Sequence, residues 1–263
     1  MMLGLIVWQQ PGHEKRLRTV TAEETAILRV PFLRLEVLRG PRTRPAALER
    51  RMVRAARKLR QAGVRYTVLP ADYPAGQWPR RHGVEVVSTL SLRRSLAADL
   101  VRRITAERGL APGSVRVAVT AGQMTGELVK TVTELALGYR YVMLDVPYGG
   151  EELCRRLRRE YGVSLLLQPD REQLESAQIL VAFDRRTDLS EENEAVVALY
   201  EGADTPFPPL TVPPAVEGQL PDGANRLQLL AALRGAGVLA PGQISLRVPA
   251  LDILKSSNYN TTL

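Results

Sequence analysis

The sequence predicts an α/β protein with a parallel sheet in its second half and a smaller α/β unit before it. Two observations carry this prediction. Between residues 115 and 200, short β-branched runs alternate with amphipathic helical segments, which is typical of a parallel sheet covered by helices. The first half alternates strand, helix and strand in the same way between residues 3 and 87. We expect about five strands in the second half, with the strand at 115–119 in the centre.

The first half begins with an apolar strand, Leu3–Trp8. One or two extended strands follow between Ile27 and Leu38, interrupted by Pro31 because proline lacks a ladder donor. Pro45 starts a helix that runs to about Ala62, and Val64–Leu69 forms the next strand.

A proline-rich loop from Pro70 to Pro79 contains Trp78, which either closes the core as a lid or lines a ligand pocket. The lid is the interpretation we favour. A brief strand at 84–87 and one helix from about Ser91 to Arg108 complete this half.

The second half contains strands and helices that alternate between residue 115 and residue 200. The expected strands are 115–119, 141–144, 163–167, 179–183 and 195–200, and the expected helices are 127–137, 151–161 and 170–174.

After residue 202, six prolines up to residue 221 predict an extended strap, and Asp222 is placed to cap a final helix at 224–233 before a last strand at 244–248. These boundaries predict three parts: a basic N-terminal unit at 1–112, a central domain at 113–203, and the strap with its helix and strand at 204–263.

The turn after the central strand, Thr120–Gly126, has the features of a phosphate-binding turn. In a strand–helix unit the free N–H groups of such a turn and the helix dipole favour an anion. Gly122 and Gly126 allow a phosphate to approach the backbone. Asp145 ends the next strand, where a carboxylate accepts hydrogen bonds from ribose hydroxyls.

The segment from Val115 to Tyr200 therefore resembles a Rossmann-type NAD(P)-binding unit. It departs from the glycine fingerprint because Thr120 replaces the first glycine and one extra residue separates Gly122 from Gly126. The resemblance implies a dinucleotide over the turn with its ribose on Asp145, and NAD rather than NADP, since the carboxylate repels a 2′-phosphate and no arginine directly follows it. S-adenosylmethionine is an alternative ligand for the same turn.

Ligands of such sheets lie beyond the carboxyl ends of the strands. The predicted cofactor-binding residues at those ends are Thr120, Gly122, Gly126, Asp145, Tyr148, Gln168 and Asp184, with Asp188 close by. Each has a structural alternative: Asp145 and Asp184 can cap the following turn, and Gln168 can be an ordinary strand end before Pro169.

No catalytic residue can be assigned from the sequence. A hydride-transfer enzyme needs a general acid or base near the cofactor, and only His82 or Lys130 stands in for one. Three functions stay open: a nucleotide-binding protein acting as an NAD(P)-dependent oxidoreductase, a non-catalytic Rossmann-like binding or scaffold protein, and a nucleic-acid-associated protein that uses the basic half.

The formal charge of +8 is concentrated in the first half. Residues 13–108 hold 22 Lys and Arg against 9 Asp and Glu, and residues 109–263 hold 14 against 19. Arg50, Arg51, Arg54, Arg57 and Lys58 lie on one predicted helix, where they either track phosphates or form a solvated face. With only four lysines among 36 cations, the arginine excess is also explained by genome composition.

One cysteine and two histidines argue against a zinc or iron site with nitrogen and sulfur ligands, whereas carboxylate-bound magnesium stays open. Cys154 is expected to be a packing residue. No run reaches the length of a membrane span, and Met1–Val7 lacks the features of a leader, so we expect a cytoplasmic protein that binds a small molecule or nucleotide, with no membrane partner and an unknown oligomeric state.

Overall fold

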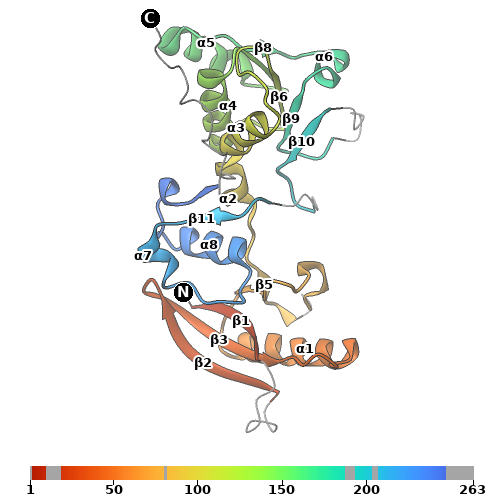
Figure 1. The fold of residues 1–263 in the computed structure, drawn as a ribbon, viewed down its shortest axis with the longest axis vertical. Coiled ribbons are helices and arrows are strands. Elements are labelled where there is room, and N and C mark those ends of the chain that lie inside the picture. The colour runs from red at the N-terminus through yellow and green to blue at the C-terminus, as the bar shows by residue number, and fades with distance from the viewer. Residues whose placement is uncertain (1, 10–18, 80–81, 187–192, 203–206, 247–263) are drawn as a thin grey trace, which may run out of the picture. The chain divides into compact units, whose positions relative to one another are not determined.

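The computed structural model describes residues 2–9, 19–79, 82–186, 193–202 and 207–246. The chain forms two compact units, each built from two segments (Figure 1). The first consists of Met1–Leu92 and Val212–Ile244, and the second of Arg93–Thr211 and Ser245–Leu263. The boundary after Leu92 precedes the division at 112 that the sequence suggests, and the segment 204–263 is shared between the two units.

The first unit contains a mixed five-stranded sheet in the order β2-β3-β1-β4-β5. Its strands are β1 (Leu3–Gln9), β2 (Val20–Ile27), β3 (Val30–Leu38), β4 (Tyr66–Val68) and β5 (Glu85–Val86). Only β2 runs antiparallel to its neighbour. β2 and β3 form a hairpin whose turn residues Leu28 and Arg29 both have positive φ, as a type I′ turn requires.

Strand β2 was not predicted from the sequence. Only its ends, Val20 and Ile27, are buried, while Ala22, Glu23 and Glu24 are exposed on the outer strand of the sheet. Such a strand has no apolar alternation to reveal it, and its charged side chains are typical of a protected sheet edge.

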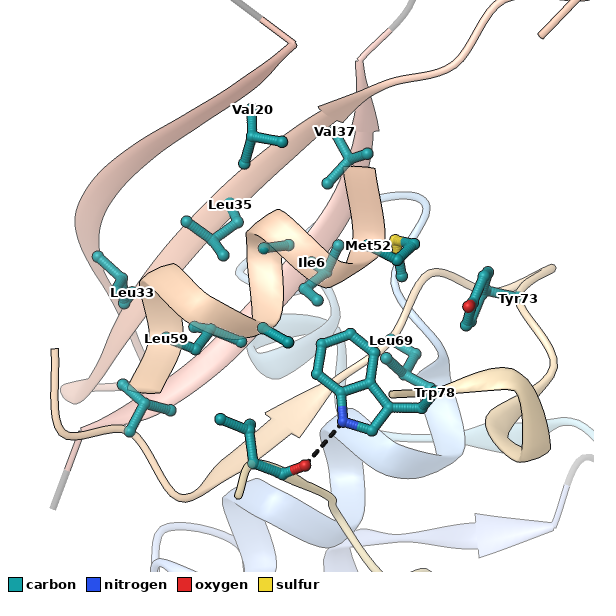
Figure 2. Packing of buried hydrophobic residues seen from close by; sticks show 14 residues of the cluster. Ile6, Val20, Leu33, Leu35, Val37, Met52, Leu59, Leu69, Tyr73 and Trp78 are labelled. Atoms are coloured by element: carbon teal, nitrogen blue, oxygen red, sulfur yellow. Dashed lines mark hydrogen bonds between the residues drawn. The ribbon is translucent and has the colours of Figure 1, made fainter. Parts of the chain in front are cut away.

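The helix α1 (Pro45–Gln61) packs on this sheet through Met52, Ala55, Ala56 and Leu59 (Figure 2). Gly4 on β1 permits the close approach, because a Cβ there would lie 2.9 Å from the Leu59 side chain and 2.7 Å from Thr67 Oγ1. Trp78 lies in the same core, 3% exposed, and its indole donates to Val84 O at 2.8 Å. Trp78 is therefore a core lid, as the sequence favours.

The C-terminal segment Val212–Ile244 completes the first unit and supplies α7 (Pro214–Glu217), α8 (Arg226–Gly235) and the short 3-10 helix η3 (Pro241–Gln243). A second short 3-10 helix, η1 (Ala75–Gln77), lies in the loop after β4. The Gln228 side chain on α8 accepts from Leu69 N at 2.8 Å, just beyond β4. The cap of α8 is Asn225 rather than Asp222. The strap prediction also fails in part, because α7 uses Pro213 and Pro214 at its start, where proline fits a helix.

The second unit contains a parallel five-stranded sheet in the order β10-β9-β6-β7-β8. Its strands are β6 (Arg116–Thr120), β7 (Tyr141–Asp145), β8 (Leu166–Leu167), β9 (Ile179–Ala182) and β10 (Ala195–Ala198), and a separate pair joins β11 (Leu210–Thr211) to β12 (Ser245–Leu246). β6 lies in the centre of the sheet, as predicted. Numbered along the chain from β6, the order is 3-2-1-4-5, which is the order of dinucleotide-binding domains.

Helices cover both faces of this sheet (Figure 1). α3 (Ala97–Glu107), α4 (Gly126–Gly138) and α5 (Gly150–Tyr161) pack in series along one face. α6 (Arg171–Glu175) packs on the other face through Leu174, which contacts a cluster with Ala118, Met143 and Leu180. The doubly covered parallel sheet explains why its strands are continuous apolar runs.

The single helix predicted before β6 is divided. Leu96 separates α2 (Leu90–Ser95) from α3, because its φ of −102° and ψ of 9° lie outside helical geometry. Just before this break, Arg93 and Arg94 at the end of α2 donate to carbonyl groups at the ends of β9 and β10. Within the described residues, no helix has the length and apolarity needed to cross a membrane.

Candidate functional site

The carboxyl ends of β6, β7 and β9 bring three of the predicted residues together. Thr120 on β6 is in register with Asp145 on β7 and with Ala182 on β9, and Asp184 follows β9 by two residues. β6 and β9 are the neighbouring strands at which the strand order reverses, and ligands of doubly wound sheets bind at that point.

The turn Thr120–Gly126 leads directly into α4. Thr125 is the N-cap residue, and its hydroxyl accepts from Leu128 N at 3.2 Å, which satisfies one free amide of the helix. Gly126 is the first helical residue. The Thr120 side chain is fully buried, and its hydroxyl has no hydrogen-bond partner among the described residues.

A carboxylate already occupies the glycine turn. The amide of Gly122 donates to Asp184 Oδ2 at 2.7 Å. A Cβ at position 122 would lie 3.3 Å from that oxygen, so the glycine gives Asp184 its close approach. Asp184 stays half exposed, with 55% of its side chain accessible.

Arg94 lies beside this contact and was not predicted as a site residue. Its guanidinium donates to Phe183 O at 2.7 Å and to Leu199 O at 3.0 Å. It lies 4.0 Å from Asp184 and 3.7 Å from Glu127 in the first turn of α4. Arg94 thus anchors the strand ends and compensates the two carboxylates next to the turn. No sequence motif marks it.

Its neighbour Arg93 is half-buried and donates to Ala198 O at 2.7 Å. Burial lowers the pKa of Arg93 from its usual value. Arg93 is therefore a structural link to β10 and not part of the turn.

The second-strand carboxylate, Asp145, is also engaged. Arg186 donates to Asp145 Oδ2 at 2.5 Å from the segment after β9. The sequence argument for NAD considered only arginines that directly follow Asp145. The folded chain supplies one from 41 residues away, so the charge of the Asp145 carboxylate is compensated by a guanidinium.

Tyr148 and Gln168 line a neighbouring cavity of about 410 Å³ at the ends of β7 and β8. Tyr148 is 86% exposed, and Gln168 has a φ of +48°. Gly149 and Gly150, which start α5, line the same cavity. The predicted residues thus form two adjacent groups, one at the turn and one at this cavity, while Asp188 lies outside the described residues.

The predicted basic face of α1 lies in the first unit, and part of it is engaged there. Arg51 donates to Leu38 O, Arg54 to Thr19 Oγ1 at 3.2 Å, and Lys58 to Val20 O at 3.0 Å. These three cations hold α1 against β2 and β3. Arg57 lines a surface hollow of about 540 Å³ with Arg54 and Lys58.

The described residues hold no group of three or more His, Cys, Asp and Glu side chains with the arrangement of a metal site. Cys154 is buried, with Sγ 4.0 Å from Leu165 O. It is a packing residue, as the sequence suggests.

No protein-family model and no curated protein matches this sequence significantly. Solved structures with similar folds include L-tryptophan dehydrogenase from Nostoc punctiforme (12% identity, 63% of this chain, 50% of that chain, TM-score 0.32). A hetero-hexameric glutamate dehydrogenase from Thermus thermophilus matches with 15% identity over 92% of this chain and 70% of its own, with a TM-score of 0.34. Shikimate 5-dehydrogenase from Listeria monocytogenes, solved with shikimate and NAD, matches with 12% identity over 70% and 68%, with a TM-score of 0.26.

The chain thus spans half the length of the first of these proteins. The parallel sheet in the order 3-2-1-4-5, with helices on both faces and a glycine turn after the first strand, makes the second unit a Rossmann-type α/β domain.

Proposed function

We propose that the second unit binds an adenine dinucleotide of the NAD(P) type at the carboxyl edge of β6. In this proposal the pyrophosphate lies over Thr120–Gly126 and the adenosine ribose lies near Asp145. The observation that carries the proposal is the 2.7 Å contact from Gly122 N to the Asp184 carboxylate. It supports the proposal because the amide of the turn is directed outward and already binds an anionic oxygen at the place where such domains bind phosphate.

Phosphate and Asp184 compete for the same amide under this proposal. Asp184 is exposed enough to move, and Arg94 remains available as its partner once the carboxylate leaves Gly122. The charge of Arg94 also offsets the repulsion between the phosphates and the nearby Glu127.

We further propose that the chain is an NAD(P)-dependent oxidoreductase, with NAD as the cofactor that the Asp145 carboxylate favours. Arg186 weakens the preference for NAD, because it compensates the charge of Asp145. The ratio of the affinities for NAD and NADP therefore reports on the net charge of the Asp145–Arg186 pair.

A non-catalytic Rossmann-like protein is the second candidate. The same two contacts favour it, because Asp184 and Arg186 satisfy the turn and the second-strand carboxylate without any ligand. In this case the glycine turn only allows α4 to pack close to β6.

Thermal unfolding with NAD, NADP and S-adenosylmethionine separates the two candidates. Ligand at a hundred times its dissociation constant stabilises the folded state by about 2.7 kcal/mol. At about 2–4 °C per kcal/mol for a protein of this size, this raises Tm by roughly 5–11 °C. Both tryptophans lie in the first unit, so the measurement should be calorimetric and not a tryptophan signal.

Gly122→Val should abolish the shift, because its side chain occupies the space of the phosphate. Gly113→Val is the matched control, since Gly113 precedes β6 with no atom within 4 Å of its Cβ position. An unchanged Tm with all three ligands would reject dinucleotide binding and favour the non-catalytic candidate.

A further inference from the structure

A second cavity of the Rossmann-type unit lies between the start of α4 and α5, and its volume is about 780 Å³. Three apolar side chains line it, from Met124, Val129 and Leu153. The exposed arginines 155, 156 and 159 line it as well. None of Gly122, Asp145 and Asp184 lines this groove. Met124 belongs to the turn Thr120–Gly126, so the groove adjoins the proposed dinucleotide site without including those three residues.

Gly149 brings one side of the groove close to the other. Its φ of +83° suits glycine, and a Cβ there would lie 3.4 Å from Met124 Cβ. The Met124 side chain therefore packs directly over the backbone that starts α5. This contact joins the glycine turn to the arginine-bearing helix and gives the groove an apolar wall.

The side chains that line the groove carry a net positive charge, from three arginines and one glutamate. Glu151 precedes Arg155 by four residues, and Glu152 precedes Arg156 by four, which is the favourable order for ion pairs along a helix. Neither pair forms within the described residues, although Lys130 with Glu134 and Arg103 with Glu107 do pair at this spacing. Glu152 is the single carboxylate that lines the groove.

Arg159 adds a third guanidinium with little compensation. Its described partner is Glu160 at 3.6 Å, and the Arg159 side chain is 79% exposed. Arg159 lies four residues after Arg155 and three after Arg156, so its side chain neighbours both of them on the helix surface, and all three line the groove.

The chemistry of the lining indicates the class of ligand. Guanidinium groups bind phosphate and carboxylate with paired hydrogen bonds, and the apolar side chains suit a hydrocarbon or aromatic part. A volume of about 780 Å³ lies within the range of small-molecule pockets. We propose that this groove binds a small organic molecule with an apolar part and at least one phosphate or carboxylate group. The proposal does not depend on dinucleotide binding.

The methionine methyl groups provide a local measurement. In protein labelled with ¹³C at the methionine methyls, Met124 reports on the groove, while the buried Met52 and Met143 are internal controls. Met124→Leu assigns the resonance. Phenyl phosphate should shift the Met124 signal with saturation and leave Met52 and Met143 unchanged, and inorganic phosphate should bind at least about tenfold more weakly because it lacks the apolar part.

Variants of the groove arginines test whether these side chains bind phenyl phosphate. The double variant Arg155→Gln with Arg156→Gln should weaken phenyl phosphate about tenfold or more. Arg158→Gln is the matched control, because Arg158 is an exposed arginine of the same helix that does not line the groove. The proposal is overturned if the Met124 shift does not saturate, if the double variant binds as well as the original, or if Arg158→Gln weakens binding equally.

The two ligand proposals fail separately. A calorimetric titration with NAD tests the glycine turn and leaves the phenyl phosphate result unaffected. Loss of NAD binding with retained phenyl phosphate binding rejects only the dinucleotide, and the reverse outcome rejects only the groove.

Discussion

Asp184 accepts a hydrogen bond from the backbone amide of Gly122 at 2.7 Å, although 62 residues separate them in the sequence. The contact places a negative charge of the protein on the amide that a ligand phosphate would use. A phosphate at this position therefore has to displace the carboxylate and is also repelled by it.

Asp184→Asn should raise the affinity for NAD and NADP by about threefold to tenfold, where tenfold corresponds to about 1.4 kcal/mol. The amide oxygen of asparagine still satisfies Gly122 but carries no charge. Isothermal titration calorimetry measures the change, with Glu160→Gln at the end of α5 as a control for net charge. Equal affinities for the variant and the original protein would place the phosphates away from Gly122.

Arg186→Gln should shift the preference toward NAD. The Asp145 carboxylate then loses its cationic partner and repels a 2′-phosphate more strongly. The ratio of the Kd of NADP to that of NAD should rise several-fold, which corresponds to about 1 kcal/mol. Arg185→Gln is the matched control in the same segment.

Asp145→Ala removes the other member of the Asp145–Arg186 pair. It should lower the affinity for NAD and relax the discrimination against NADP, because the carboxylate that repels a 2′-phosphate is removed while the positive charge of Arg186 stays. A ratio that responds to neither variant would show that the ribose does not lie near Asp145.

Thr125→Ala should lower the free energy of unfolding by about 0.5–2 kcal/mol, since Leu128 N loses its capping partner. Urea unfolding followed by far-ultraviolet circular dichroism measures this loss. Thr125→Ser should restore most of the stability. Thr133→Ala serves as the control, because its hydroxyl only bonds back to Val129 O within the same helix.

Asp72→Asn should destabilise the first unit at neutral pH, and the effect should disappear in acid. Burial alone raises the pKa of Asp72, but hydrogen bonds from Trp8 and Arg39 outweigh it, so the pKa lies below its ordinary value of 3.8. A lowered folded-state pKa contributes stability above the unfolded pKa, and this contribution is lost as the pH falls through the folded pKa.

Trp8 fluorescence is the natural measurement, because the indole donates to this carboxylate and Arg39 lies 4.9 Å from its ring centroid. The difference in Tm between Asp72→Asn and the original protein should narrow below about pH 4. A difference that stays constant between pH 7 and pH 3 would assign the effect to packing instead of charge.

The sequence predicts most of the Rossmann-type unit because its signals are local. Apolar runs give β6, β7 and β9, and the capping residues Thr125 and Asp170 lie where their helices begin. Strand β2 escapes prediction because its middle is exposed, and the break at Leu96 has no glycine or proline to mark it.

The contacts that decide the chemistry of the site are not local. Arg186 reaches Asp145, and Arg94 reaches Asp184, only after the strands have assembled in their final order. The one available signal was the position of Arg186 just after the fourth predicted strand, which parallel pairing places at the same sheet edge as Asp145. Nothing in the sequence around Arg94 indicates its place.

The discontinuous first unit has a consequence for synthesis on the ribosome. Its α8 follows the entire segment Arg93–Thr211, yet Gln228 supplies the acceptor for Leu69 N and the carbonyl of Leu69 accepts from Asn225 N. The strands β1 to β5 are therefore synthesised first, but α8, which completes their unit, is synthesised only after every strand of the Rossmann-type sheet. A nascent chain that has emerged from the ribosome as far as residue 211 should hold an assembled second sheet and an incomplete first unit, which reverses the usual order in which N-terminal domains mature.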